Sequence, residues 1–279
     1  MALFVTSRLL SDARVVHGFS LRTGGVSEGA FASLNLSASV GDLEARVSQN
    51  LDRLSEAAAP GLGLPFATVS QVHGDRIVEA LLSEQGPFFH ELMPESQAGH
   101  AAVTGEAQVG LVRADAVVTR SPVLLAAVRV ADCVPVLLHD VRTGHSAAVH
   151  SGWRGARLSI AARAVSALQA HPEDLLAAIG PCIGRCCYEV SRELAKDFRE
   201  VFGTRAADDP ETNPKPHLDL RYCVEHALLL AGVQPEHLEQ VPGCTSCEPE
   251  RFFSHRRDKG NTGRMLGFIA AIPPATTPA

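Results

Sequence analysis

Hydrophobic and polar positions follow a helical period in the first part of the chain. Apolar residues recur with helical spacing over 43–59, after a capping turn at Gly41-Asp42 and before a stop at Pro60-Gly61. A strand is expected next, ending near 71–74. Residues 86–110 are rich in Pro, Gly, Ser and His and lack a clear period. They predict a surface loop or insertion within one domain spanning 1–279.

After Ala114 the pattern changes to short aliphatic and β-branched runs, which are typical of strands in a buried sheet. These runs cover 115–119, 123–130, 134–141 and 146–150. Helices are then expected at 157–170, 192–202 and 218–231, and strands at 175–179 and 265–272, the last closing the sheet. Because the strands come in runs, the order favours a mixed α/β sandwich over a doubly wound parallel sheet.

Composition and charge narrow the class of protein. Hydrophobic residues make up 46% of the 279 residues and charged residues 20%, values of an ordinary folded domain. The formal net charge is −6, and no block rich in Lys and Arg interrupts it. We therefore expect no binding to nucleic acid.

From the sequence we expect neither a targeting segment nor a membrane-spanning one. Its start lacks the basic leader and cleavage site of a signal peptide. The most apolar window, 123–141, contains Arg129, Asp132, His139 and Asp140 and is too polar to cross a bilayer. Seven cysteines, an odd number in a long chain, favour reduced thiols. Together these features predict a cytoplasmic protein.

Candidate metal chemistry lies where strands give way to turns. Cys133 follows Ala131-Asp132, and His150 opens the run His150-Ser151-Gly152-Trp153-Arg154-Gly155. With His73 as third ligand, these residues would form a zinc site with one open position, as catalytic sites do. Such a site can activate water for hydrolysis or deamination.

Other interpretations of these residues stay open at this point. Buried cysteines are common, and a histidine at a strand end often only satisfies a carbonyl group. Cys133 and His150 also suit a nucleophile and base of a cysteine hydrolase. The remaining cysteines are interpreted as structural. Cys244 and Cys247 form a lone C-x-x-C without the second pair of a zinc ribbon, and no βαβ unit frames a redox site.

Two arginines are candidates for anion binding. Arg22 stands beside Gly24 and Gly25, whose backbone N–H groups can approach phosphate, although these residues taken alone favour a Gly-Gly hairpin turn with a solvated arginine. Arg154 follows Trp153 in a turn that precedes a helix, where N–H groups and a cation can meet. Trp153 suits stacking on a purine or anchoring a core.

Motifs along nearly the whole chain resemble those of the YfiH-like family, the purine nucleoside phosphorylases earlier described as laccase-domain or polyphenol oxidase proteins. Their ordered series is more specific than any one motif. The matching segments are His17-Gly18-Phe19-Ser20, Arg22-Thr23-Gly24-Gly25-Val26-Ser27, Ser33-Leu34-Asn35-Leu36, Val40-Gly41-Asp42, Gln71-Val72-His73-Gly74, Ala131-Asp132-Cys133, Val149-His150-Ser151-Gly152-Trp153-Arg154-Gly155, Gly180-Pro181-Cys182-Ile183-Gly184, Phe253-Ser254-His255-Arg256-Arg257 and Gly263-Arg264.

The resemblance implies a four-layer α/β/β/α fold and a metal held by His73, Cys133 and His150, for which zinc is expected and copper is the alternative. It implies phosphorolysis of adenosine, inosine, guanosine and methylthioadenosine, and deamination of adenosine, in a monomer or small homo-oligomer. Asp132 is the candidate proton carrier for deamination. Candidate contacts to nucleoside and phosphate are Arg22, Gly24, Gly25, Asn35, Gln71, Arg154, Cys182 and Arg257.

The sequence departs from the family pattern in two places. His255 stands where many members have Tyr, and 86–110 is longer than usual, so the cavity mouth is expected to differ locally.

Two further functions make other demands on the sequence. A copper polyphenol oxidase would need several His-rich motifs, which the sequence lacks. A noncatalytic binding module would keep its function after Cys133→Ala.

Overall fold

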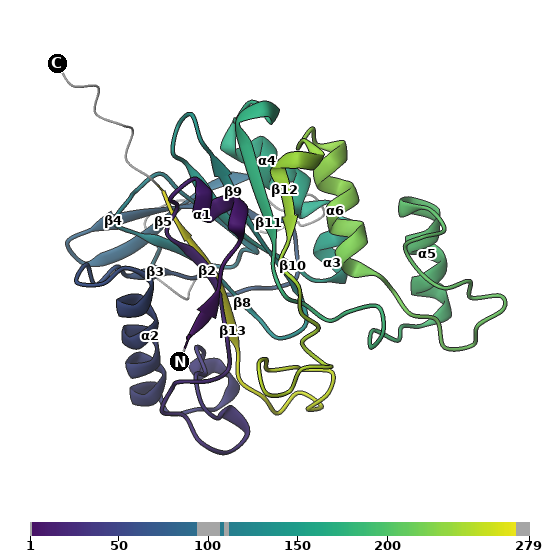
Figure 1. Ribbon diagram of the computed structural model, residues 1–279, viewed down its shortest axis with the longest axis horizontal. Coiled ribbons are helices and arrows are strands. Elements are labelled where there is room, and N and C mark those ends of the chain that lie inside the picture. The colour runs from purple at the N-terminus through teal and green to yellow at the C-terminus, as the bar shows by residue number, and fades with distance from the viewer. Residues whose placement is uncertain (1, 94–106, 109–111, 272–279) are drawn as a thin grey trace.

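Two mixed β-sheets pack face to face between layers of helices (Figure 1). The computed structural model describes residues 2–93, 107–108 and 112–271. The five-stranded sheet has the order β1 (Phe4–Val5), β2 (His17–Ser20), β13 (Met265–Ala270), β8 (Leu125–Val130) and β3 (Phe66–Ala67). The eight-stranded sheet has the order β12 (Leu238–Gln240), β11 (Leu175–Ile179), β9 (Val134–Asp140), β10 (Ser146–Ser151), β7 (Ala116–Thr119), β4 (Ile77–Ser83), β5 (Gly86–Met93) and β6 (Ala107–Gln108).

Helices cover the outer face of each sheet, as Figure 1 shows. Helix α2 (Glu44–Ala58) packs on the five-stranded sheet, and α3 (Trp153–Arg157), α4 (Ile160–Leu168), α5 (Arg192–Phe202) and α6 (Leu220–Leu230) belong to the layer on the eight-stranded sheet. The remaining helices are α1 (Arg8–Asp12) and the short 3₁₀ turns η1 (Gly29–Phe31), η2 (Ala38–Val40), η3 (Pro172–Asp174) and η4 (Pro235–His237). The mixed α/β, four-layer fold expected for this single domain is confirmed.

Alternating side chains place the central strands in two hydrophobic layers at once. On β8, Leu125 and Ala127 face the layer with α2, whereas Ala126 and Val128 face the other sheet. On β9, Val136 packs toward the outer helices, while neighbouring residues face inward. Strands buried on both faces read as continuous apolar runs, which explains why their sequences lack alternation.

Several predicted elements are confirmed. The helix expected at 43–59 is α2, those at 192–202 and 218–231 are α5 and α6, and the five runs from 115 to 179 are β7, β8, β9, β10 and β11. Strand β13 is also present, but it lies between β2 and β8 and does not close an edge. Likewise β8 belongs to the five-stranded sheet, so the four runs do not form one sheet. Local sequence does not encode this choice of partner.

Two predictions need correction. Gly86–Met93 is not a loop: it is β5, which pairs with β4 in a hairpin and buries Phe89 fully. Its Gly, Pro and His residues conceal the strand period. Of the expected 86–110 insertion, 94–106 and 109–110 lie outside the described residues. The helix expected at 157–170 is α4, which begins only at Ile160, because Ser159 with a positive φ of 57° separates it from the short helix α3 that ends at Arg157.

Within the part of the chain that the structure describes, no helix is both long and apolar enough to pass through a bilayer.

Candidate metal centre

Three side chains remote in sequence meet at one point between the two sheets and a loop. The ligand atoms of His73, Cys133 and His150 all lie within 4.8 Å of one another. The two imidazole rings are 4.9 Å apart between centroids and almost perpendicular, at 79°. The structure therefore brings together the three residues that the sequence nominates as metal ligands.

The backbone around these residues explains why they converge. Cys133 lies in the short turn that carries the chain from β8 in one sheet to β9 in the other. Asp132 adopts a positive φ of 92° in that turn, and His73 has a φ of 64° in the loop before β4. Positive φ values are uncommon outside glycine, and Asp and His are among the residues that tolerate them. His150 comes from β10, directly beside β9.

Asp115, which the sequence alone does not single out as a site residue, holds two of the three central residues in place. Its fully buried carboxylate accepts backbone N–H groups from Val72 at 3.2 Å, His73 at 2.9 Å and Gly74 at 2.8 Å. The same carboxylate is 2.8 Å from His150 Nδ1. One side chain thus fixes the His73 loop and the orientation of His150. A charged residue at the head of an apolar strand was the available signal for it.

Electrostatics favour a thiolate at Cys133. Burial raises the pKa of this thiol, but the charge and hydrogen bonds of His150, and then those of His73, lower the pKa to about 6. Burial lowers the pKa of His150, yet the Cys133 sulfur and the Asp115 carboxylate raise it to about 10. Metals bind thiolate and neutral imidazole, so binding at this site would release the His150 proton.

The donor set suits a metal ion with catalytic character. One sulfur and two imidazole nitrogens are ligands of zinc, and three protein ligands leave a position for substrate or water. Because Asp115 engages His150 Nδ1, the other ring nitrogen Nε2 is left for a metal, an arrangement common in metal sites. Gly152 keeps the space open: a Cβ there would lie 2.9 Å from His73 Cδ2 and 3.2 Å from Cys133 Sγ.

Gly152→Ala is expected to lower activity on the order of 10- to 100-fold, because its methyl group would displace the His73 ring from the centre. Steady-state kinetics and metal content check this. Ser151→Ala is the adjacent control, since Ser151 Oγ is buried without a hydrogen-bond partner among the described residues. Equal activity in both variants would show that the space at Gly152 is irrelevant.

The three residues open onto a cavity of about 630 Å³, large enough for a nucleoside. Its walls come from the η2 segment, the loop before β4, the β8–β9 turn, the segment after β11 and the C-terminal loops. Besides the three central residues they comprise Ser37, Ala38, Ser39, Val69, Ser70, Gln71, Arg129, Ala131, Asp132, Ile183, Tyr188, His255, Arg256 and Arg264.

Arg129 and Arg264, which the sequence does not single out as site residues, bring positive charge to the cavity lining. Both arginines are partly buried, and burial lowers the pKa of both guanidinium groups, which stay charged at neutral pH. Arg129 donates to Val69 O and Thr68 Oγ1, and Arg264 donates to Thr262 O and Gly263 O. An arginine inside an apolar run, as at Arg129, was the signal for one of them.

Gln71 and Asp132 are the other predicted site residues that line the cavity. Gln71 clamps the backbone of Arg129, accepting its N–H at 2.7 Å and donating to its carbonyl at 2.8 Å. Asp132 accepts hydrogen bonds from Thr245 Oγ1 and the Arg256 N–H, each at 2.6 Å. Both side chains therefore hold cavity walls in place, and their roles toward substrate stay predictions.

Arg22, Gly25 and Asn35 lie behind the wall and not on it. Arg22 donates to the carbonyls of Ala32 and Pro249 and stacks on a phenyl ring. Next to it, a Cβ on Gly25 would collide with the Ser33 carbonyl oxygen, and Gly24 has a positive φ of 92°, so the backbone itself calls for glycine at both positions. Asn35 is fully buried and accepts the backbone N–H of Arg264 at 2.9 Å.

Arg154, Cys182 and Arg257 also lie outside the cavity lining. The Arg154 guanidinium covers the Trp153 ring at 4.5 Å. Cys182 is fully buried, and burial raises the pKa of its thiol to about 11. Arg257 donates to the carbonyls of Thr245 and Phe252 and pairs with Asp258. Contact of these residues with substrate stays a prediction.

Comparisons with known proteins show which family the chain belongs to. Residues 16–272 match the family model described as multi-copper polyphenol oxidoreductase laccase. The purine nucleoside phosphorylase YlmD of Geobacillus stearothermophilus is 37% identical over 266 residues, which cover 92% of this chain and 90% of that one. The purine nucleoside phosphorylase YfiH of Escherichia coli is 35% identical over 256 residues, covering 91% and 92%.

Solved structures give the same result for the fold. The crystal structure of YlmD from Geobacillus stearothermophilus superposes with a TM-score of 0.78 at 33% identity, covering 97% of this chain and 99% of that one. The Bacillus licheniformis protein YfiH superposes with a TM-score of 0.77 at 32% identity, covering 93% of each chain. On sequence and fold together, this chain belongs to the family described as multi-copper polyphenol oxidoreductase laccase, alongside the YfiH and YlmD purine nucleoside phosphorylases.

Proposed function

We propose that this protein is a zinc-dependent purine nucleoside phosphorylase that acts on adenosine, inosine, guanosine and methylthioadenosine and also deaminates adenosine. The convergence of His73, Cys133 and His150 at one end of a nucleoside-sized cavity carries the proposal. The names of the relatives support the same reaction class. We further propose that it acts in the cytoplasm, as a monomer or small homo-oligomer.

Phosphorolysis breaks the bond between the purine nitrogen and the anomeric carbon, while a phosphate oxygen forms a new bond to that carbon. The purine leaves with the electron pair and takes up a proton. A bound zinc ion would supply Lewis-acid stabilisation of negative charge. The chain must hold phosphate, orient the ribose and stabilise the leaving base.

Phosphate is assigned to the positive wall. Arg129 and Arg264 border the cavity, and Ser37 and Ser39 provide hydroxyl groups beside them. Guanidinium groups match phosphate oxygens in charge and geometry. This assignment replaces Arg22 and Arg154 as the main anion contacts, because Arg129 and Arg264 line the cavity and those two do not.

Another part of the cavity lining suits the purine. Tyr188 and Ile183 offer aromatic and apolar surface, and Arg256 covers the Tyr188 ring at 5.0 Å. For deamination, Asp132 is proposed to carry the proton that the leaving amino group needs, because its carboxylate borders the cavity beside Cys133.

The test is incubation of the purified protein with adenosine, with and without phosphate, followed by chromatography. Adenine and ribose-1-phosphate should form only with phosphate, and inosine in both cases. His73→Ala should lower both activities to background, because a ligand of the metal is lost. If neither base nor inosine forms above the level of this variant, the enzyme proposal fails.

A cysteine hydrolase is the second candidate, because a thiolate at Cys133 beside a protonated His150 also describes an activated nucleophile. Removal of metal by a chelator separates the two. The phosphorylase should lose activity and regain it with zinc, whereas a thiol hydrolase would work without metal. A multi-copper oxidase is disfavoured, because the His-containing cluster among the described residues holds two histidines and one cysteine.

A further inference from the structure

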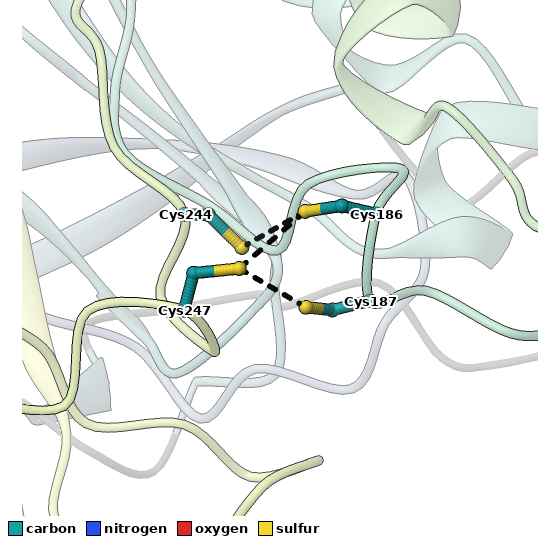
Figure 2. A group of neighbouring side chains, drawn as sticks. All are labelled: Cys186, Cys187, Cys244 and Cys247. Atoms are coloured by element: carbon teal, nitrogen blue, oxygen red, sulfur yellow. Dashed lines mark hydrogen bonds between the residues drawn. The ribbon is translucent and has the colours of Figure 1, made fainter.

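Four cysteines from two segments that are distant in the sequence point toward one another (Figure 2). Cys186 and Cys187 follow β11, whereas Cys244 and Cys247 follow β12. All four are free thiols, and their sulfur atoms lie within 4.8 Å of one another. The sequence interpretation of a lone C-x-x-C is wrong here, because Cys186-Cys187 supplies the missing pair from far away in the chain.

The spacing of the sulfurs fits one tetrahedral ion. Four thiolates at a zinc–sulfur distance of about 2.3 Å lie about 3.8 Å from one another. In the structure Cys186 Sγ is 3.8 Å from Cys244 Sγ and 3.5 Å from Cys247 Sγ, and Cys187 Sγ is 3.3 Å from Cys247 Sγ. A disulfide requires about 2.05 Å, and an iron–sulfur cluster spreads its thiolates over several irons.

The backbone is arranged to hold negative sulfur. The Gly184 N–H donates to Cys244 Sγ at 3.2 Å, and the N–H groups of Ser246 and Cys247 point at the same atom. Gly184 has to approach closely, since a Cβ there would lie 3.1 Å from Cys186 Sγ and 3.4 Å from Cys244 Sγ. N–H groups aimed at a cysteine sulfur orient and stabilise the thiolate form that metals bind.

Turn geometry lets two adjacent cysteines face the same point. In an extended strand neighbouring side chains point to opposite sides. Here the Cys187 and Tyr188 N–H groups both donate to Gly184 O, at 3.0 and 3.1 Å, which closes a tight turn around Arg185 and Cys186. Nearby, Arg221 donates to Gly243 O at 2.6 Å and places positive charge close to Cys244.

We propose that Cys186, Cys187, Cys244 and Cys247 bind a second, structural zinc ion that fastens together two walls of the cavity. Four cysteine ligands leave no position for substrate, as in structural zinc sites. The ion joins Cys187, beside the cavity residue Tyr188, to the loop whose Thr245 holds Asp132 at 2.6 Å. It therefore sets the position of Asp132 and Tyr188 without touching substrate.

Metal analysis of protein purified under reducing conditions tests this proposal. The wild-type chain should hold about two equivalents of zinc, one for each cluster. Cys247→Ser should lose one of them. Cys223→Ala removes a buried thiol that lies outside the cluster, on α6, and should lose none. Wild-type zinc content in Cys247→Ser, or a disulfide between two of the four cysteines in the reduced protein, would overturn the site.

X-ray absorption on the His73→Ala variant gives an independent readout. With the other centre disabled, the remaining zinc should show a shell of sulfur alone at about 2.3 Å. Cobalt substitution in the wild-type chain should add thiolate-to-metal absorption that survives loss of His73, which keeps the test valid if Cys247→Ser does not fold. A nitrogen-containing shell or the visible absorption of an iron–sulfur cluster would refute the assignment. These readouts do not depend on enzyme activity, so the proposed function can fail separately.

Discussion

Replacing Cys133 by serine is expected to lower kcat/KM for adenosine phosphorolysis about 1000-fold, or about 4 kcal/mol of transition-state stabilisation. A serine hydroxyl keeps the size of the side chain, but it does not ionise at neutral pH and binds zinc poorly. The protein should lose the zinc bound at this centre and keep the zinc bound by the four-cysteine cluster. Kinetics and metal analysis on the same preparation measure both effects.

The matched control for Cys133→Ser is Cys223→Ser. Cys223 is a fully buried thiol on α6, in the layer outside the eight-stranded sheet. Its replacement should cost stability and leave kcat/KM close to that of the wild-type protein. Activity in Cys133→Ser within a few-fold of this control would mean that the thiolate has no part in the reaction.

Asp115→Asn is expected to lower both zinc affinity and kcat/KM by about 10- to 100-fold, the usual effect of losing a carboxylate behind a metal-bound histidine. The asparagine amide is neutral and presents an NH₂ group where the carboxylate accepts hydrogen bonds from His73 N and His150 Nδ1. The His73 loop and the His150 ring should therefore lose their fixed orientation. Zinc titration and steady-state kinetics report the two losses separately.

Asp140→Asn distinguishes this effect from a general loss of stability. Asp140 is also fully buried and accepts hydrogen bonds from Arg142 and Thr143, but it lies at the far end of β9 from Cys133. Its replacement should lower the melting temperature with little change in zinc affinity. If both asparagine variants lose zinc equally, Asp115 acts only as a folding residue.

Much of the fold is predictable from local sequence, because helices such as α2 and α5 show a clear period and apolar strands such as β9 are buried on both faces. Sheet membership is not predictable in this way. Nothing within 125–130 records that β8 pairs with β13, more than a hundred residues later. The strand β5 was missed because its polar and special residues obscure its alternation.

The candidate site, too, is predictable only in those parts that depend on local sequence. The three central residues can be predicted from ligand chemistry and motif resemblance, because cysteine and histidine are metal ligands whatever their neighbours are. Asp115 and Arg129 act through contacts with segments remote in sequence, and those partners are visible only after folding. The four-cysteine cluster was missed for the same reason: Cys187 and Cys247 lie far apart in the chain but 3.3 Å apart between sulfurs.

Anomalous diffraction at the zinc absorption edge, from a crystal of the protein as purified, tests the central claim most directly. The account predicts a zinc peak bonded to the side chains of His73, Cys133 and His150, with an open coordination position toward the cavity. A crystal in which this point carries no zinc signal, or in which copper alone gives the peak, would contradict it.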